Sequence, residues 1–536
     1  MTLTDLSVPP GTPDDVRAQA ARGEPREPCS DPTLGVPVPR TGRRGVPPHR
    51  LVVLGDSLSH GFQSGAVYNT DLSWPAIVAH ELGWLDRFRY PVYGGPGGLP
   101  LNLELLLRRL EERFGRRLSL WETPLALFEA RGFLDEVEDH WERGPGHVPP
   151  RTGRALHNLS VYGWDLRDTL SRTAGDLERA TGRADDSFLD QAVQDATERA
   201  ALRVYPRWDD EARQQTLVDA ATGLGRDHGE AEAGIETLVV FLGANNALPA
   251  VTDLRVRWSD AGFQDLRRKG ACTVWRPEHF AVELAELVAA VRRIDARHVI
   301  WCTVPHVTIA PIARGIGAKV RAGSRYYAHY ARPWVDDARF DPARDAHLTE
   351  HDARAVDAAI DLYNTGIEAA VRDARRGTGG TPRDWYLLDV AGLLDRLASR
   401  RYVTDPAARP SWWTPYPLPP ALAALQPALD SRFLVGDGRG GRAAGGLFSL
   451  DGVHPTTVGY GLLAQEVITV MAAAGVVFTD RTGRPRGLPV QVDFDRLLRR
   501  DSLVRRPPQL LDSALDLLGW ADENLRWVSR TLSWRV

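Results

Sequence analysis

The chain has 536 residues, of which 43% are hydrophobic and 25% are charged, and its formal net charge is −4. These proportions are typical of a soluble globular protein, and they exclude collagen, a coiled-coil rod and wholesale disorder. The near-neutral charge gives no reason to expect nucleic acid or an anionic membrane surface as a partner.

The cysteines and the N-terminus bear on the cellular compartment. Cys29, Cys272 and Cys302 are odd in number and widely spaced, which excludes a disulfide framework and a CxxC metal site. The first residues lack the basic and apolar regions of a secretory signal, and no segment reaches the ~18 uninterrupted apolar residues of a membrane span. We therefore expect a cytoplasmic protein without a membrane span. The sequence does not indicate its oligomeric state.

The first 50 residues contain ten of the 38 prolines and no aromatic residue. Such a segment buries too little apolar surface to offset the entropy that it loses on ordering. We therefore expect residues 1–48 to form a flexible or loosely draped extension, and the fold to begin at His49.

Apolar runs and helical patterns alternate through the middle of the chain. The runs are apolar on both faces, which suits central strands of a parallel sheet. They lie at 51–54, 156–161, 237–242, 298–304 and 385–390. The helical patterns between and after them lie at 73–82, 280–293, 356–371 and 462–474. This alternation predicts one α/β domain over residues 49–480, with a parallel sheet covered by helices on both faces.

Several stretches exceed what a minimal alternating core needs. We interpret the regions near 94–154, 165–232 and 402–447 as insertions into the one domain. The first of them contains a leucine-rich helix over 101–114. The tail, residues 481–536, includes an amphipathic helix near 510–532, whose apolar face is expected to dock on the core.

The tetrapeptide Gly55-Asp56-Ser57-Leu58 directly follows the first predicted strand. In open α/β folds, ligands bind at the carboxyl edge of the sheet, where this serine would lie. The backbone amides of a helix that begins there would favour a developing negative charge. Taken alone, the tetrapeptide is equally consistent with a capped helix.

A second motif, Asp451-Gly-Val-His454-Pro455, precedes the last helix of the domain. Three-residue spacing brings a carboxylate and an imidazole to the same side of a turn. The carboxylate can then accept from Nδ1–H of the histidine and leave Nε2 free as a base. This motif, too, could be only a capped turn.

Two further positions lie at predicted strand ends. Gly163 follows the second strand, and Gly243-Ala-Asn245-Asn246 ends the third. A glycine amide and an asparagine side-chain amide at that edge could donate to an oxyanion. Each alone is weak, because glycine and asparagine commonly form turns.

The four pieces together, in this order, resemble the SGNH/GDSL hydrolase superfamily. The resemblance covers roughly residues 50–475, and the run 449–457, Ser-Leu-Asp-Gly-Val-His-Pro-Thr-Thr, is its most specific match. It implies a three-layer α/β/α sandwich with a flavodoxin-like parallel sheet, here carrying large insertions. The chain departs from the family pattern at Asn246, where an aspartate is usual. We expect the Asn246 side chain to brace the turn and not to donate to the oxyanion.

The resemblance also implies a chemistry, namely hydrolysis of an ester or thioester through an acyl-enzyme, without metal or cofactor. Ser57 would be the nucleophile, His454 the base, and Asp451 the residue that orients it. The amides of Ser57 and Gly163 and the side chain of Asn245 would form the oxyanion hole.

Other candidate residues are weaker. His306 follows the fourth strand and could face the same cleft, but a hydrogen-bonded loop histidine is the favoured interpretation. The segments Tyr326-Tyr327 and Arg332-Pro-Trp334 could line a substrate pocket, although aromatic packing under a long loop is favoured.

The run from His347 to His351, His-Leu-Thr-Glu-His, matches the HxxEH zinc-peptidase pattern. That chemistry needs both histidines on one face of a helix. Thr349 with an acidic residue three positions later instead indicates a helix N-cap, which would leave His347 outside the helix. No metal site is therefore expected.

The sequence thus predicts a GDSL-type esterase or lipase acting on a small-molecule or lipid ester. An acyltransferase would use the same residues, and a non-catalytic binding protein could share the scaffold. The sequence does not identify the substrate-binding residues.

Overall fold

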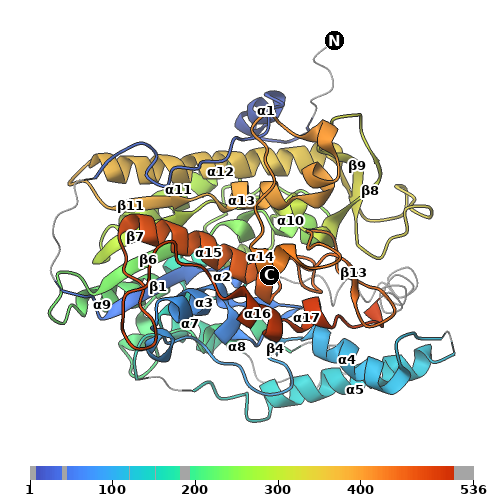
Figure 1. Ribbon diagram of the computed structural model, residues 1–536, viewed down its shortest axis with the longest axis horizontal. Helices are drawn as coiled ribbons and strands as arrows, with labels where there is room; N and C mark the ends of the chain where they lie inside the picture. Colours follow the sequence, from blue (N-terminus) through green and yellow to red (C-terminus); the bar gives the residue numbers. More distant parts are fainter. Residues whose placement is uncertain (1–7, 39–44, 120, 151–152, 182–192, 512–536) are drawn as a thin grey trace.

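The computed structural model describes residues 8–38, 45–119, 121–150, 153–181 and 193–511 of the chain (Figure 1). Its centre is a sheet of five parallel strands in the order β11-β7-β6-β1-β5. The strands are β1 (His49–Gly55), β5 (Asn158–Ser160), β6 (Ile235–Phe241), β7 (Ala296–Cys302) and β11 (Trp385–Leu388). Each overlaps one of the five apolar runs, so the prediction of a parallel α/β sheet is confirmed.

The apolar runs form central strands because both faces of the sheet are covered. Successive side chains of a strand point to opposite faces. In β1, Val52 and Leu54 belong to one hydrophobic cluster, while Leu51 and Val53 belong to the other. All four of these side chains are fully buried.

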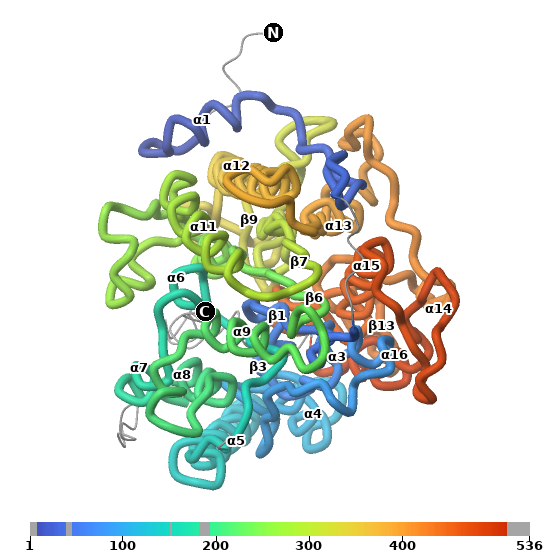
Figure 2. The backbone as a smooth tube through the Cα atoms, turned by 90° about the vertical axis from the view of Figure 1, so that its left-hand side faces the viewer, coloured from blue at the N-terminus to red at the C-terminus, as the bar shows by residue number. Residues whose placement is uncertain are grey.

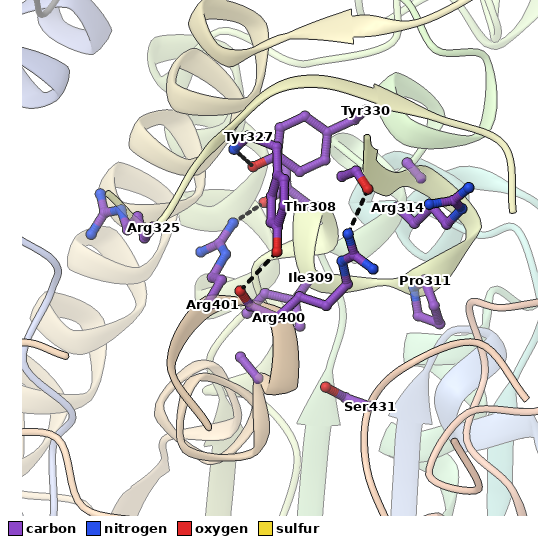
Figure 3. Close-up of a pocket in the computed structure, with 13 residues that line it drawn as sticks. Thr308, Ile309, Pro311, Arg314, Arg325, Tyr327, Tyr330, Arg400, Arg401 and Ser431 are labelled. Carbon is purple, nitrogen blue, oxygen red and sulfur yellow. Dashed lines mark hydrogen bonds between the residues drawn. The ribbon is translucent and has the colours of Figure 1, made fainter. Parts of the chain in front are cut away.

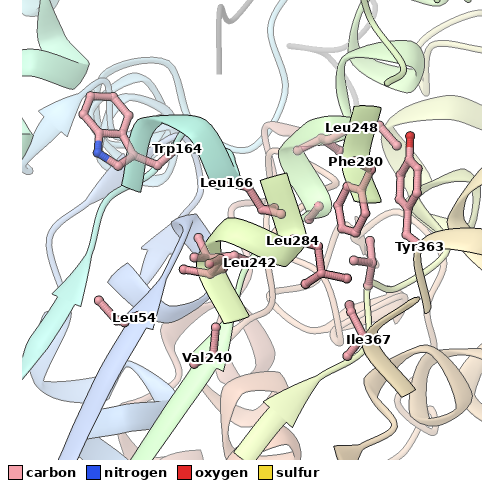
Figure 4. Packing of buried hydrophobic residues seen from close by; sticks show 14 of the residues in the cluster. Leu54, Trp164, Leu166, Val240, Leu242, Leu248, Phe280, Leu284, Tyr363 and Ile367 are labelled. Carbon is pink, nitrogen blue, oxygen red and sulfur yellow. The ribbon is translucent and has the colours of Figure 1, made fainter. Parts of the chain in front are cut away.

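Helices form a layer on each face of the sheet. One face packs against α9 (Leu217–Arg226), α11 (Pro277–Val291) and α12 (Glu350–Arg376). Figure 4 shows Phe280 and Leu284 of α11 beside Tyr363 and Ile367 of α12 in this core. The other face packs against α3 (Trp74–Glu81) and α15 (Thr457–Ala474).

The helix α15 is apolar and 18 residues long. Within the described part of the chain it is the one helix whose length and composition would also suit a membrane span. About two thirds of it is buried inside the protein, where it packs against α3 and α16 (Phe494–Arg500). Its apolar composition is therefore accounted for by core packing.

The described part of the proline-rich N-terminal segment, residues 8–38, packs on the domain, which its composition did not indicate. Residues 14–21 form α1 (Asp14–Ala21), which crosses over α12 and packs against it (Figures 1 and 2), and Val16 is completely buried there. Farther on, Arg26 pairs with Asp389 at 2.8 Å and with Glu368 at 2.5 Å. These ion pairs and the buried valine supply the ordering contacts that the composition did not indicate.

The insertions surround the sheet. Between β1 and β5 the chain forms a pair of helices, α4 (Leu103–Phe114) and α5 (Thr123–Glu142), seen at the lower right of Figure 1. Between β5 and β6 lie α6 (Leu166–Ser171), α7 (Ala174–Ala180), α8 (Ala196–Ala201) and α9. The stretch between β11 and α15 contains α13 (Val390–Leu397), the short helix η9 (Ser399–Val403), α14 (Pro420–Ala423) and the hairpin of β12 (Val435–Gly436) and β13 (Arg442–Ala444).

A further small sheet was not indicated by the sequence pattern. It lies between β7 and α12 and consists of β8 (Arg314–Lys319), β9 (Tyr327–Ala331) and β10 (Leu348–Thr349), all antiparallel. Its strands are short and partly exposed, so they lack the continuous apolar runs of the central strands.

The described part of the C-terminal tail packs on the core. Phe494 and Leu497 of α16 lie in the same hydrophobic cluster as α15. The helix α17 (Ser502–Arg505) follows. The predicted amphipathic helix near 510–532 lies outside the described residues, except for Leu510 and Leu511, both of which are buried.

Candidate active site

Ser57 lies at the turn between β1 and the short helix α2 (Ser57–His60). Asp56 caps this helix, and its Oδ1 accepts from the Leu58 amide at 3.0 Å. Gly55 fits here because a Cβ on it would lie 2.5 Å from Oγ of Ser59 and 2.9 Å from Oγ of Ser160. The turn therefore presents Ser57 at the carboxyl edge of the sheet, as expected.

The structure brings Ser57, His454 and Asp451 together from distant parts of the chain. Nε2 of His454 lies 2.8 Å from Oγ of Ser57, and Nδ1 lies 3.1 Å from Oδ2 of Asp451. All three lie in a continuous line of hydrogen-bonding contacts, and the serine and histidine are only 3% exposed. This is the geometry that lets a carboxylate orient an imidazole and the imidazole accept a proton from a hydroxyl.

The carboxylate of Asp451 is held by backbone amides as well as by the imidazole. Its Oδ1 accepts from the amides of Val453 and His454, each at 2.8 Å, and its Oδ2 accepts from the Gly65 amide at 3.0 Å. Burial raises the pKa of Asp451, but the charge of His454 and these hydrogen bonds outweigh it, so the pKa lies below its usual value. Asp451 is thus ionised at neutral pH.

The Gly65 contact was missed by the sequence analysis. Gly65 lies in the hairpin of β2 (Phe62–Gln63) and β3 (Ala66–Val67). Its two turn residues, Ser64 and Gly65, have φ angles of 50° and 83°, as a tight type I′ turn requires. The Ser-Gly dipeptide was the available signal for this turn. From the same hairpin, the Phe62 ring lies 4.5 Å from the His454 ring, centroid to centroid.

Gly163 and Asn245 follow the two strands that flank β1. Gly163 comes three residues after the end of β5, and Asn245 comes four residues after the end of β6. Since β5, β1 and β6 are adjacent and parallel, the segments carrying Gly163, Ser57 and Asn245 leave the sheet at one edge. Along the chain, β1 is followed by β5 on one side of it and then by β6 on its other side. In open sheets, ligand crevices form at such a reversal of strand order.

Each of the two candidate donor residues also makes a hydrogen bond to a neighbouring residue. Gly163 has a φ of 78°, which favours glycine, and its carbonyl accepts from Nζ of Lys269 at 2.6 Å. Nδ2 of Asn245 donates to the Trp164 carbonyl at 2.8 Å. That bond uses one of the two amide hydrogens and fixes the plane of the group. The role of Lys269 had no sequence signal.

We expected the Asn246 side chain to brace the turn, but in the described structure it makes no hydrogen bond. It is completely buried, and neither Oδ1 nor Nδ2 has a hydrogen-bond partner among the described residues. Its backbone makes the structural contacts instead: the amide donates to Gly243 at 3.2 Å and the carbonyl accepts from Trp275 at 2.8 Å.

Asp56, beside the serine, has an unusual environment. It is completely buried, and its Oδ2 has no hydrogen-bond partner in the described part of the chain. Burial raises the pKa of Asp56 to about 7. Its role in the structure is that of the helix cap.

His306 lies in a buried ionic cluster and is hydrogen-bonded, as favoured from the sequence. Its Nδ1 lies 3.2 Å from Asp395, and its Nε2 lies 3.1 Å from Asp361. Burial disfavours the charged ring, but Asp395, Asp357 and Asp361 outweigh it and raise the pKa of His306 to about 10. His306 is therefore a cation that ties the loop after β7 to α12 and α13.

The aromatic candidates divide between packing and a pocket. Tyr326 is buried and donates to Asp357 at 3.0 Å, while Arg332 donates to the Thr252 carbonyl. Tyr327 differs because it lines a pocket beside β8.

The HxxEH segment has the geometry of a helix cap. Thr349 caps α12 and forms a capping box with Asp352, so the predicted N-cap is confirmed. His347 precedes the helix, and its Nδ1 lies 2.8 Å from the Asp345 carbonyl. Over the described residues, no group of three or more His, Cys, Asp or Glu side chains could hold a metal ion.

Comparison of the chain with protein-family models, with curated proteins and with solved structures found no match. The geometry of the site is therefore the basis for the functional argument.

Proposed function

We propose that the protein is a serine hydrolase that cleaves a carboxylic ester or thioester through an acyl-enzyme. One observation carries the proposal: Ser57, His454 and Asp451 form a line of two hydrogen bonds, at 2.8 Å and 3.1 Å, at the carboxyl edge of a parallel sheet. This arrangement activates a serine hydroxyl, which is a poor nucleophile on its own.

In the proposed mechanism, Oγ of Ser57 attacks the ester carbonyl while Nε2 of His454 takes its proton. His454 then returns the proton to the leaving alcohol or thiol. In the second half of the reaction, His454 takes a proton from the water that attacks the acyl-enzyme and returns it to Oγ of Ser57 as the acid leaves. Asp451 holds Nδ1–H and stabilises the imidazolium that forms. The amides of Ser57 and Gly163 and Nδ2 of Asn245 would stabilise the oxyanion.

We further propose that the chain is related to the SGNH/GDSL hydrolases. Numbered in chain order, the five central strands lie in the order 2-1-3-4-5, which is that of flavodoxin-like sheets and supports the proposal. The segments that carry Gly163, Ser57 and Asn245 follow three adjacent parallel strands, which also supports the proposal.

Hydrolysis of p-nitrophenyl esters of increasing acyl length tests the proposed activity. We expect turnover by the wild type and a loss of roughly 10⁴–10⁶ in kcat in Ser57→Ala, because the nucleophile and base act as one unit. Ser160→Ala is the matched control, since Ser160 is buried near the same turn and its Oγ has no hydrogen-bond partner in the described chain. A folded Ser57→Ala variant with wild-type turnover would contradict the assignment.

A further inference from the structure

A pocket rich in arginine lies beside the small sheet of β8 and β9. It is a small pocket with a cavity volume of about 30 Å³, and it is partly open to solvent. Arg314, Arg325, Arg400 and Arg401 line it, together with polar groups that include Thr308 and Tyr327 (Figure 3). No Asp or Glu is among the described residues that line it.

Two of these arginines are already neutralised by carboxylates outside the pocket lining. Arg314 pairs with Asp337 at 2.6 Å, and Arg401 pairs with Asp357 at 2.7 Å. Their charges are therefore largely satisfied within the protein.

Arg400 is different. Its guanidinium reaches across the pocket to donate to the Gly315 carbonyl at 2.7 Å and lies 4.8 Å from the centre of the Tyr327 ring (Figure 3). In the described part of the chain, Arg400 has no direct ion pair, although Asp337, the partner of Arg314, also interacts with it electrostatically. Its Nε–H is buried without a hydrogen-bond partner there. A partly buried guanidinium whose direct partners are a carbonyl and a ring has unused hydrogen-bonding capacity for an anion.

The pocket wall also touches the loop that carries the proposed catalytic pair. Pro311 and Ala313 line the pocket, and the amide of Ile312 between them donates to the Gly452 carbonyl at 3.0 Å. Gly452 directly follows Asp451 in the turn that ends at His454. One short strip of backbone therefore separates the pocket from the catalytic turn.

We propose that this pocket is an anion subsite, in which Arg400 binds a carboxylate or phosphate group carried by the substrate. The inference rests on the proposed ester hydrolysis for its role in catalysis. It narrows the substrate class to esters whose acyl or alcohol part carries a negative charge. A guanidinium is suited to both oxyanions because its planar donors match their oxygen geometry.

Anion binding can be measured independently of turnover. Calorimetric titration of the folded Ser57→Ala protein with glutarate, and separately with inorganic phosphate, asks whether a site exists and which oxyanion it prefers. We expect at least one anion to bind, and Arg400→Gln in the same background to weaken that binding tenfold or more. Arg400→Lys, which keeps the charge, should retain part of the affinity and shows that loss in Arg400→Gln is not loss of folding.

Arg396→Gln is the matched control. Among the described residues, the direct partners of Arg396 are likewise backbone carbonyls and a ring: it donates to the Thr414 and Pro415 carbonyls at 3.2 Å and lies 5.4 Å from the Tyr416 ring centre. It does not line the pocket. Absence of binding by both anions, or an equal effect of Arg396→Gln and Arg400→Gln, would overturn the subsite.

Kinetics then test the role in substrate choice. p-Nitrophenyl hemiesters of dicarboxylic acids with four to eight carbons are compared with the same esters methylated on the free carboxylate. We expect wild type to prefer at least one hemiester, and Arg400→Gln to lower that preference tenfold or more, while Arg396→Gln keeps it. An unchanged preference in Arg400→Gln overturns the substrate role. Binding without hydrolysis of any ester would instead refute the proposed function and leave the anion site standing.

Discussion

Asn245 and Asn246 are adjacent in the chain but have opposite surroundings. Asn245 is oriented by its bond to the Trp164 carbonyl, at the edge where the oxyanion would form. Asn246 is sealed in the interior with both side-chain polar atoms unpaired in the described structure. The family resemblance proposes the donor at Asn245, and the two adjacent residues can be distinguished by substitution.

Alanine substitutions should separate the two residues kinetically. Asn245→Ala should lower kcat by roughly 10²–10³ with a smaller change in KM, because the lost donor acts mainly in the transition state. Asn246→Ala should keep kcat within about threefold. Its stability should stay within about 1 kcal/mol of wild type, since relief of two unpaired polar atoms offsets the new cavity. Kinetics on one aryl ester and thermal midpoints measure both, and a large kcat loss confined to Asn246→Ala would assign the donor to that residue instead.

At the scale of single residues, the sequence indicated the members of the site but not what holds them. Asp451 and His454 were identified because their spacing within one turn is local information. The amide of Gly65 on Asp451 is nearly 400 residues away in the chain and comes from a two-residue turn. Contacts of that kind depend on tertiary packing and leave no periodicity in the sequence.

Among the elements, the central strands were predictable and the small sheets were not. Burial on both faces forces each central strand to be continuously apolar, so that the pattern is visible in sequence. The strands β8, β9 and β10 face solvent on part of their length and are short, and they form only because they pair with one another. The arginine pocket is lined in part by residues of this sheet, so the sequence pattern did not indicate the pocket either.

His306 fastens several elements, and its charge predicts a dependence of stability on pH. Because the folded-state pKa is raised to about 10, its contribution is fully present below the unfolded pKa of about 6.5 and is lost as pH rises toward 10. The wild-type thermal midpoint should therefore fall between pH 7 and pH 10. His306→Gln should be less stable at pH 7 and show a flatter decline over that range. Parallel slopes for the two proteins would show that His306 does not titrate as argued.

For the whole molecule, the proposed chemistry requires no metal ion. Charge in the transition state would be stabilised by amides, and the base is an imidazole. Activity should therefore survive dialysis against EDTA unchanged. Loss of activity on chelation, with recovery on addition of Zn²⁺, would contradict this mechanism and direct attention back to His347 and His351.

At the N-terminus, the ordered part of the molecule is longer than the sequence composition indicates. Composition alone suggested a flexible extension, but α1 and Arg26 attach this segment to α12 and to Asp389. A few long-range contacts order a proline-rich segment that has little apolar surface of its own. Average composition cannot reveal them, because each depends on a partner more than 300 residues away.

The most direct test of the central claim is covalent labelling by a fluorophosphonate probe, read out by peptide mass spectrometry. The account predicts a single adduct on Ser57 in the wild type, no such adduct in Ser57→Ala, and much slower labelling in His454→Ala, because the imidazole activates the hydroxyl. Ser160→Ala should label at the wild-type rate. A folded wild-type protein that stays unlabelled, or an adduct formed equally fast on another serine in Ser57→Ala, would contradict the assignment of Ser57 as the nucleophile.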